Sequence, residues 1–193
     1  MPDAAQTEGR LVATLNDLIQ LDHDAVQSYT LALALITDSA RHEVLSGFRA
    51  DHERHVRELA ALVRAHGGVP IHLPHIPTGP FKLAMQATGA VAGDHGVLLA
   101  FKTNEGQVRE RYRRALDESW PPEAQTVVAR AAHDEDVHYE WVMQELERLG
   151  HGSGTITGTA QAAVEGITRR AADVMDGAER GAMRIVEELR RRE

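Results

Sequence analysis

The sequence has no cysteine among its 193 residues. This absence excludes disulfides, thiolate metal sites, iron–sulfur clusters and a catalytic thiol, so any bound metal must be held by nitrogen and oxygen ligands. Aromatic residues are scarce, at 4%, and the alternation typical of strands is hard to find. Alanine, leucine, arginine and glutamate dominate instead. These features predict an all-α protein.

Long apolar runs and an excess of positive charge are missing as well. No run of about 18 apolar residues is present, which argues against a conventional transmembrane helix and hence against a membrane partner. The formal net charge of -8 argues against a general nucleic-acid binder, which would show a basic face. The chain begins with acidic and polar residues and no apolar stretch. We therefore expect no secretory signal and a cytoplasmic location.

Apolar residues at helical spacing predict a bundle of four helices within residues 1–150. The expected helices run from about residue 7 or 9 to 37, from 39 to the glycines at 67 and 68, from 94 to the prolines at 121 and 122, and from there to Gly150. Residues 67–93 are rich in proline and glycine, with one short helical stretch near 81–88. Such a connection is long enough to travel the length of the bundle, so we expect two helical hairpins joined by a crossover.

The last part of the chain is predicted to be separate from the bundle. Residues 151–160 are glycine-rich and read as a flexible linker. Residues 161–193 repeat apolar positions at helical spacing, and residues 164–193 carry seven arginines and seven acids. We expect this amphipathic helix to act in association, for example in a homo-oligomer, although packing on its own bundle remains open.

Two segments carry unusual residues in the same order at a constant offset of 83 positions. Asp22 matches Glu105, Tyr29 matches Tyr112, His52 matches Glu135, and His55 matches His138. Each lies on the expected apolar face of a helix, where an ionised carboxylate without a partner costs several kcal/mol. An i,i+3 pair leaves one helix face, so both side chains can reach one ion. The repeat predicts a duplicated hairpin enclosing a metal site.

Ordinary structural roles stay open for each of these residues taken alone. The acids could pair with arginine or histidine across the bundle, the histidines could be hydrogen-bonded core residues, and the tyrosines could simply pack. Asp51 and Asp134 lie one turn before His55 and His138, and either acid could be a ligand or accept a hydrogen bond from a ligand. Four further histidines are expected to be exposed loop residues: His72, His75, His95 and His151.

The pattern resembles the ferritin-like di-iron carboxylate proteins, which include bacterioferritin, rubrerythrin and manganese catalase. Over about residues 11–150 it is most similar to small bacterial ferritin-like proteins grouped as a domain of unknown function, through LNDLIQLDHDAVQSY, GFRADHERHVREL and HGGVP. The resemblance implies a ferritin-like four-helix bundle. The implied metal ligands are Asp22, His52, His55, Glu105, Glu135 and His138.

The resemblance also implies an activity. Two iron ions, with manganese or zinc as alternatives, would react with dioxygen or peroxide, and Tyr29 and Tyr112 would be catalytic neighbours. If the protein is an enzyme, it would be a ferroxidase or related oxidoreductase acting in iron oxidation or oxidative-stress defence. The chain departs from the family at His52, where a bridging glutamate is usual, because a neutral imidazole binds one metal through one nitrogen. A stress-related structural or interaction protein with a degenerate or purely structural metal site is the alternative.

Overall fold

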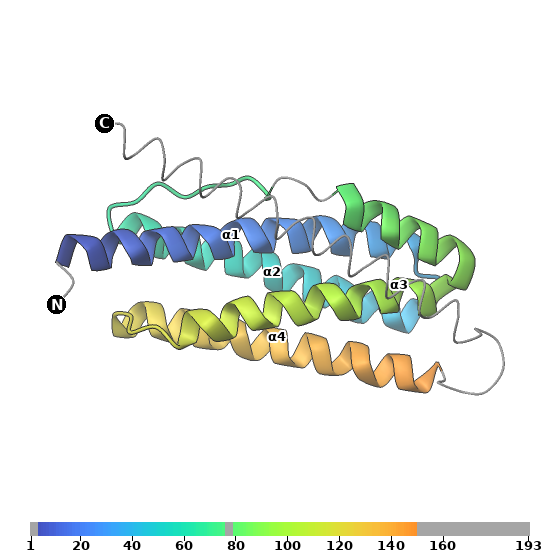
Figure 1. Cartoon of the computed structure of the whole chain (residues 1–193). Helices are drawn as coiled ribbons and strands as arrows, with labels where there is room; N and C mark the ends of the chain where they lie inside the picture. The colour runs from blue at the N-terminus through green and yellow to red at the C-terminus, as the bar shows by residue number, and fades with distance from the viewer. Residues whose placement is uncertain (1–3, 76–78, 150–193) are drawn as a thin grey trace.

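A computed structural model describes residues 4–75 and 79–149, and within these ranges the chain folds as four α-helices without a strand (Figure 1). The helices are α1 (Ala4–Leu35), α2 (Ser39–Ala65), α3 (Gly79–Leu116) and α4 (Pro122–Arg148). The predicted all-α four-helix bundle is confirmed. The predicted linker at 151–160 and helix at 161–193 lie outside the described residues, so the division into domains stays a prediction.

The helices form two hairpins, α1 with α2 and α3 with α4, whose helices pack against each other (Figure 1). After α2 the chain runs back along the bundle, and the first part of α3 continues to the far end, where the helix turns (Figure 1). This route places the part of α3 after its turn antiparallel beside α1, and α4 beside α2. The predicted crossover between two hairpins is therefore present, and it brings all four helices around one interior.

The ends of α2 follow from local sequence. Asp38 caps its first turn, because Asp38 Oδ1 accepts a hydrogen bond of 2.9 Å from the backbone N–H of Arg41. Gly67 adopts a φ of 72°, a left-handed conformation that glycine reaches without a Cβ clash. The backbone N–H of Gly68 then bonds to the carbonyl of Val63 at 2.8 Å, which ends the helix.

A kink at Gly93 divides α3 into two helical legs, with a φ of 57° and a ψ of -142°. The second leg therefore begins at Asp94, where the sequence predicts a helix start. Asp94 Oδ1 accepts hydrogen bonds from the backbone N–H and the hydroxyl of Thr37, at 2.9 and 3.0 Å. Asp94 Oδ2 accepts from the backbone N–H of Asp38 at 3.2 Å and from Arg41 at 3.1 Å. One carboxylate thus joins α3 to the turn between α1 and α2.

The interior consists of two apolar clusters with a polar layer between them. One cluster surrounds Leu15, Leu59 and Val128, and the other surrounds Ala32, Leu45 and Phe101. Between them lie buried acids and histidines from all four helices. Because apolar packing encloses this layer on both sides, its side chains cannot turn toward water without disrupting the core.

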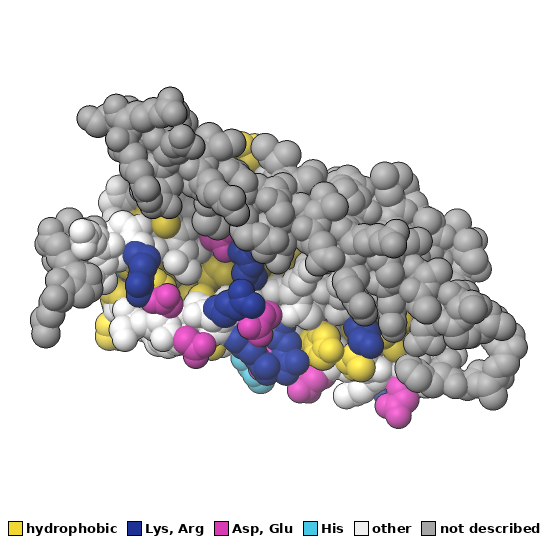
Figure 2. Space-filling view, in the orientation of Figure 1, with side chains coloured by type: hydrophobic (Ala, Val, Ile, Leu, Met, Phe, Trp, Pro, Cys, Tyr) yellow, Lys and Arg dark blue, Asp and Glu magenta, His cyan; other side chains and the backbone are white. Residues whose placement is uncertain are grey.

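The surface in view carries charges of both signs. Figure 2 shows basic and acidic side chains side by side over the middle of the bundle. Among the described ion pairs, Arg113 and Arg114 of α3 contact Asp136 and Glu110 at 2.9 and 3.0 Å. Within the described ranges, no helix combines the length and the apolar character needed to cross a membrane.

Candidate metal centre

Six side chains predicted as metal ligands meet in the polar layer of the bundle. One comes from α1, two from α2, one from α3 and two from α4: Asp22, His52, His55, Glu105, Glu135 and His138. The three carboxylates and His52 are 0% exposed, and the other two histidines are 1% exposed. Helical periodicity explains why they point the same way, since each occupies a position on the core-facing stripe of its helix that is otherwise apolar.

The six side chains form two groups of four that could each hold a metal ion. The first group contains Asp22, His52, His55 and Glu135, and the second contains His52, Glu105, Glu135 and His138. Within each group the ligand atoms lie within 4.8 Å of one another. His52 and Glu135 belong to both groups, so the two candidate sites are adjacent.

The distances between these atoms suit a shared cation better than direct hydrogen bonds. Glu135 Oε1 lies 3.5 Å from Nδ1 of both His52 and His55, and Glu135 Oε2 lies 3.7 Å from His138 Nδ1. His138 Nδ1 is 3.9 Å from Glu105 Oε2. Nitrogen and oxygen atoms that each lie about 2.1 Å from one ion are roughly 3–4 Å apart. The spacing therefore leaves room for an ion between the ligand atoms.

Many of these buried atoms have no hydrogen-bond partner. Both carboxylate oxygens of Glu105 and both of Glu135 are unpaired, as are Nδ1 of His55 and His138 and Nε2 of His52. Buried polar atoms in proteins are almost always paired, so such a concentration requires a cause. Nitrogen and carboxylate oxygen donors of this kind suit Fe, Mn, Zn or Cu, and the residues present fit a transition metal.

Asp22 differs from the other two acids because protein groups already satisfy it. His52 Nδ1 lies 2.9 Å from Asp22 Oδ1, and the Tyr112 hydroxyl donates a hydrogen bond of 2.6 Å to Asp22 Oδ2. For Asp22, pairing across the bundle, which the sequence left open, therefore occurs. Glu105 and Glu135 differ from Asp22, because none of their oxygens has a hydrogen-bond partner and the neighbouring histidine nitrogens lie 3.5–3.9 Å away.

The pKa values indicate that the cluster attracts positive charge. Burial alone would lower the pKa of His55, but contacts with Asp22 and Glu135 outweigh it and raise the pKa to about 10. Burial is likewise outweighed at His138, where Asp51 and Glu135 raise the pKa to about 9. Burial and then repulsion from Glu135 raise the pKa of Glu105. Protons therefore balance the acids when no metal is bound.

Asp51 and Asp134 each contact the Nε2 atom of a candidate ligand histidine, and in both cases the histidine lies on the other helix of the pair α2 and α4. His55 Nε2 on α2 lies 3.1 Å from Asp134 Oδ2 on α4, and His138 Nε2 on α4 lies 3.2 Å from Asp51 Oδ2 on α2. A carboxylate accepts hydrogen bonds, so each Nε2 carries the donated proton. The Nδ1 atoms then face the interior of the cluster. The two acids therefore accept hydrogen bonds from candidate ligands and lie outside the two ligand groups.

The two tyrosines flank the cluster at opposite ends and are 0% exposed. The Tyr112 hydroxyl bonds to Asp22, whereas the Tyr29 hydroxyl has no hydrogen-bond partner. Burial, followed by the negative charge of Glu105, raises the pKa of Tyr29 well above its ordinary range. Each tyrosine is therefore influenced by an acid that comes from the other hairpin.

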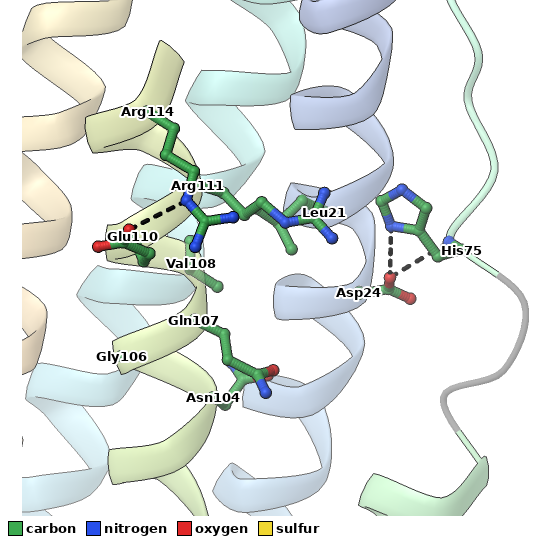
Figure 3. Close-up of a pocket in the computed structure, with 10 residues that line it drawn as sticks. All are labelled: Leu21, Asp24, His75, Asn104, Gly106, Gln107, Val108, Glu110, Arg111 and Arg114. Atoms are coloured by element: carbon green, nitrogen blue, oxygen red, sulfur yellow. Dashed lines mark hydrogen bonds and ion pairs between the residues drawn. The ribbon is translucent and has the colours of Figure 1, made fainter. Parts of the chain in front are cut away.

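A cavity of about 230 Å³ lies between α1 and α3 (Figure 3). Its lining includes Leu21, Asn104 and Val108 but none of the six candidate ligands. His75 also lines this cavity and is clamped by Asp17 and Asp24 at 3.2 and 3.1 Å. The expectation that His75 is exposed is wrong, because its side chain is only 11% exposed.

The other outer histidines fall into different environments. His72 is exposed, as predicted, but His95 lies within α3 and is partly buried. The exposed position predicted for His95 in a loop is therefore wrong, because the helix begins before it. His151 lies outside the described residues. Among the described residues, the six residues of the polar layer account for every group of three or more candidate ligands.

A family model described as a domain of unknown function (DUF2383) matches residues 10–118, which is more than half of the chain. The chain belongs to the DUF2383 family. The DUF2383 match spans α1, α2, the crossover and α3, and includes Asp22, His52, His55 and Glu105. It ends before α4, which carries Glu135 and His138. No curated protein matches the chain.

Proposed function

We propose that this DUF2383 protein binds transition-metal ions, with two iron ions as the favoured content and manganese or zinc as alternatives. The observation that carries the proposal is the pair of buried four-residue groups that share His52 and Glu135. The oxygens and nitrogens of these groups that lack a hydrogen-bond partner would bond to a metal cation, which suits such donors. The proposal extends the ferritin-like resemblance from fold to chemistry.

Each residue has a distinct place in the proposed centre. Asp22 and His55 would hold one ion, while Glu105 and His138 would hold the other. Glu135 faces both groups with different oxygens, which suits a bridging ligand. His52 would serve only one ion, because its Nδ1 is bonded to Asp22. This asymmetry supports unequal affinities for the two ions.

We further propose oxidation chemistry at this centre. Bound iron would supply electrons to dioxygen or peroxide, which links the protein to iron oxidation or oxidative-stress defence. Tyr112 would orient Asp22 through its hydrogen bond. Tyr29, buried and without a hydrogen-bond partner, would be the closer match to a redox-active tyrosine. The apolar clusters on both sides would exclude water from the reacting groups.

The second candidate is a structural or interaction protein whose metal site is degenerate. The bond between His52 and Asp22 supports it, since this bond occupies two atoms that an active dinuclear centre would use. In that case one ion would bind in the group of Glu105 and His138 and would act by joining the helices. Association through residues 161–193 would fit either candidate.

Metal analysis of the purified protein, followed by Fe(II) oxidation with dioxygen or peroxide, separates these functions. The first candidate predicts up to two metal ions per chain and oxidation faster than in protein-free buffer. The second predicts one ion or less and no acceleration. Protein that binds none of Fe, Mn, Co and Zn after metal addition would contradict the first candidate and would favour the second, with a degenerate site. Anomalous diffraction at the metal edge would then identify the ligands of any ion found.

A further inference from the structure

Arg54 lies at the solvent-facing side of the cluster, between α2 and α4. Its side chain is 33% exposed, and the two acids that it contacts, Asp51 and Asp134, are 29% and 23% exposed. The histidines behind these acids are 1% exposed. The three charged residues therefore separate the buried cluster from solvent on this side.

One guanidinium contacts both acids. Arg54 Nη1 lies 2.5 Å from Asp51 Oδ1, and Arg54 Nη2 lies 2.7 Å from Asp134 Oδ2. Each acid also accepts a hydrogen bond from a histidine of the opposite helix, His138 at 3.2 Å and His55 at 3.1 Å. A planar guanidinium presents donors in a rigid fork, so it restricts the rotation of both carboxylates at once.

The internal repeat does not supply a second such arginine. At the offset of 83 positions, Arg54 corresponds to Val137, which is 45% exposed. Asp51 and Asp134 are nevertheless equivalent in the repeat. Two equivalent acids thus depend on a single cation, and the dependence crosses from one hairpin to the other.

We propose that Arg54 is a positioning residue that orients both His55 and His138, acting through Asp134 and Asp51, and on His55 also through the approach of Arg54 Nη2 to His55 Nε2 at 3.4 Å. Fixing the two carboxylates keeps the donated proton on Nε2 of each imidazole and keeps each Nδ1 turned toward the cluster. The two ligand groups are therefore tied to one side chain outside them. This inference rests on the proposed metal binding for its consequence, but the orientation of the imidazoles can be measured without metal.

The first test uses the metal-free full chain. A buried, hydrogen-bonded imidazole N–H exchanges slowly with water and gives a separate proton NMR signal far downfield. The wild type should show such signals for Nε2 of His55 and of His138, besides that of His52 Nδ1, which is bonded to Asp22. Asp134→Asn should remove the signal of His55, and Asp51→Asn that of His138. Arg54→Gln should broaden or remove both. The crossed assignment matters, because an acid that acted only within its own helix would give the opposite pairing.

A matched control comes from the same pair of helices. Arg130 on α4 contacts Glu58 on α2 at 2.5 Å, but neither residue is paired with a histidine. Arg130→Gln should leave both imidazole signals intact. If Arg54 merely joined α2 to α4, the two glutamine variants would behave alike. Arg54→Lys should restore the signals only in part, because one ammonium lacks the fork geometry.

The second test titrates Co²⁺ into each folded variant. Arg54→Gln should weaken every Co²⁺ binding step by about 10–100-fold, whereas Asp51→Asn or Asp134→Asn should weaken mainly one step. Unchanged imidazole signals and unchanged affinities in Arg54→Gln would overturn the proposal. A wild type that binds no Co²⁺ would contradict the proposed function, while the metal-free signals would still decide the role of Arg54.

Discussion

The two hairpins carry matching residues at the centre of the bundle but treat them differently. In the first hairpin, Asp22 is bonded to both His52 and Tyr112. In the second, Glu105 and Glu135 have no hydrogen-bond partner for any of their four oxygens. One histidine in place of an acid, together with one shorter acid, therefore leaves the carboxylate of the first half fully hydrogen-bonded. Most of the unmet binding capacity lies in the second half.

The largest expected effect on metal binding comes from substitution of Glu135. This residue belongs to the second hairpin, yet it faces histidines of both groups. We expect Glu135→Gln to weaken metal binding in both groups by more than about 100-fold, beyond the loss typical of an indirect partner. Titration with Co²⁺ measures the effect, and Glu140→Gln on the exposed face of α4 is the control. Wild-type stoichiometry in Glu135→Gln would contradict a shared ligand.

His52→Glu makes the two hairpins alike. The change should raise metal occupancy toward two ions per chain and speed Fe(II) oxidation, because a carboxylate can bridge where an imidazole cannot. The metal-free protein should lose about 3 kcal/mol of unfolding free energy, since Asp22 loses a partner and another acid is buried. Metal analysis, stopped-flow absorbance and urea denaturation measure these effects. His42→Glu, exposed on the same helix, controls for charge, and unchanged occupancy and rate would count against the idea.

The two tyrosines test the same difference between the hairpins through a smaller change, in the free energy of unfolding. Tyr112→Phe removes a hydrogen bond to a buried acid and should cost about 1–3 kcal/mol of unfolding free energy. Tyr29→Phe removes a hydroxyl that has no partner and should change this free energy by less than about 1 kcal/mol. Urea denaturation of the metal-free variants provides the measurement. Equal losses in the two variants would show that the hairpins do not differ in this respect.

His75 gives the smallest expected effect, and it depends on pH. Burial lowers the pKa of His75, but hydrogen bonds to Asp17 and Asp24 outweigh burial and raise the pKa from 6.5 to about 9. The charged pairs should therefore stabilise the fold fully below about pH 6.5, and the contribution should disappear as the pH rises through about 9. We expect a loss of about 1 kcal/mol across this window. Denaturation at both ends of this pH window should show a smaller loss of unfolding free energy in His75→Gln than in the wild type. Identical pH profiles of the two proteins would refute the role of His75.

The sequence predicted those parts of the molecule that repeat along a helix. Periodicity placed Asp22, Glu105 and Glu135 on buried stripes, and the long proline-rich connection indicated the crossover. Their proximity in the structure is consistent with the predicted centre, and their binding of metal remains a prediction. What the repeat could not reveal depends on contacts between helices. Residue spacing does not predict that Asp51 and Asp134 each contact a histidine on the other helix. Nor does it predict the burial of His75.

Arg54 shows this limit clearly. Its counterpart in the repeat is a valine, so a search for matched residues passes over it. On an isolated helix it would read as an ordinary surface arginine. Only the approach of α2 to α4 gives it two acids to contact. A residue that breaks the internal repeat can therefore contact both halves of a duplicated site.

The contact of Asp94 with the turn between α1 and α2 has a consequence for cooperativity. The backbone amides of Thr37 and Asp38 belong to the first hairpin, but their acceptor comes from the second. Neither hairpin can open at this end without exposing groups of the other. Although both residues are exposed, their amides should exchange with deuterium at the rate of whole-bundle unfolding, and the two halves should melt in one transition.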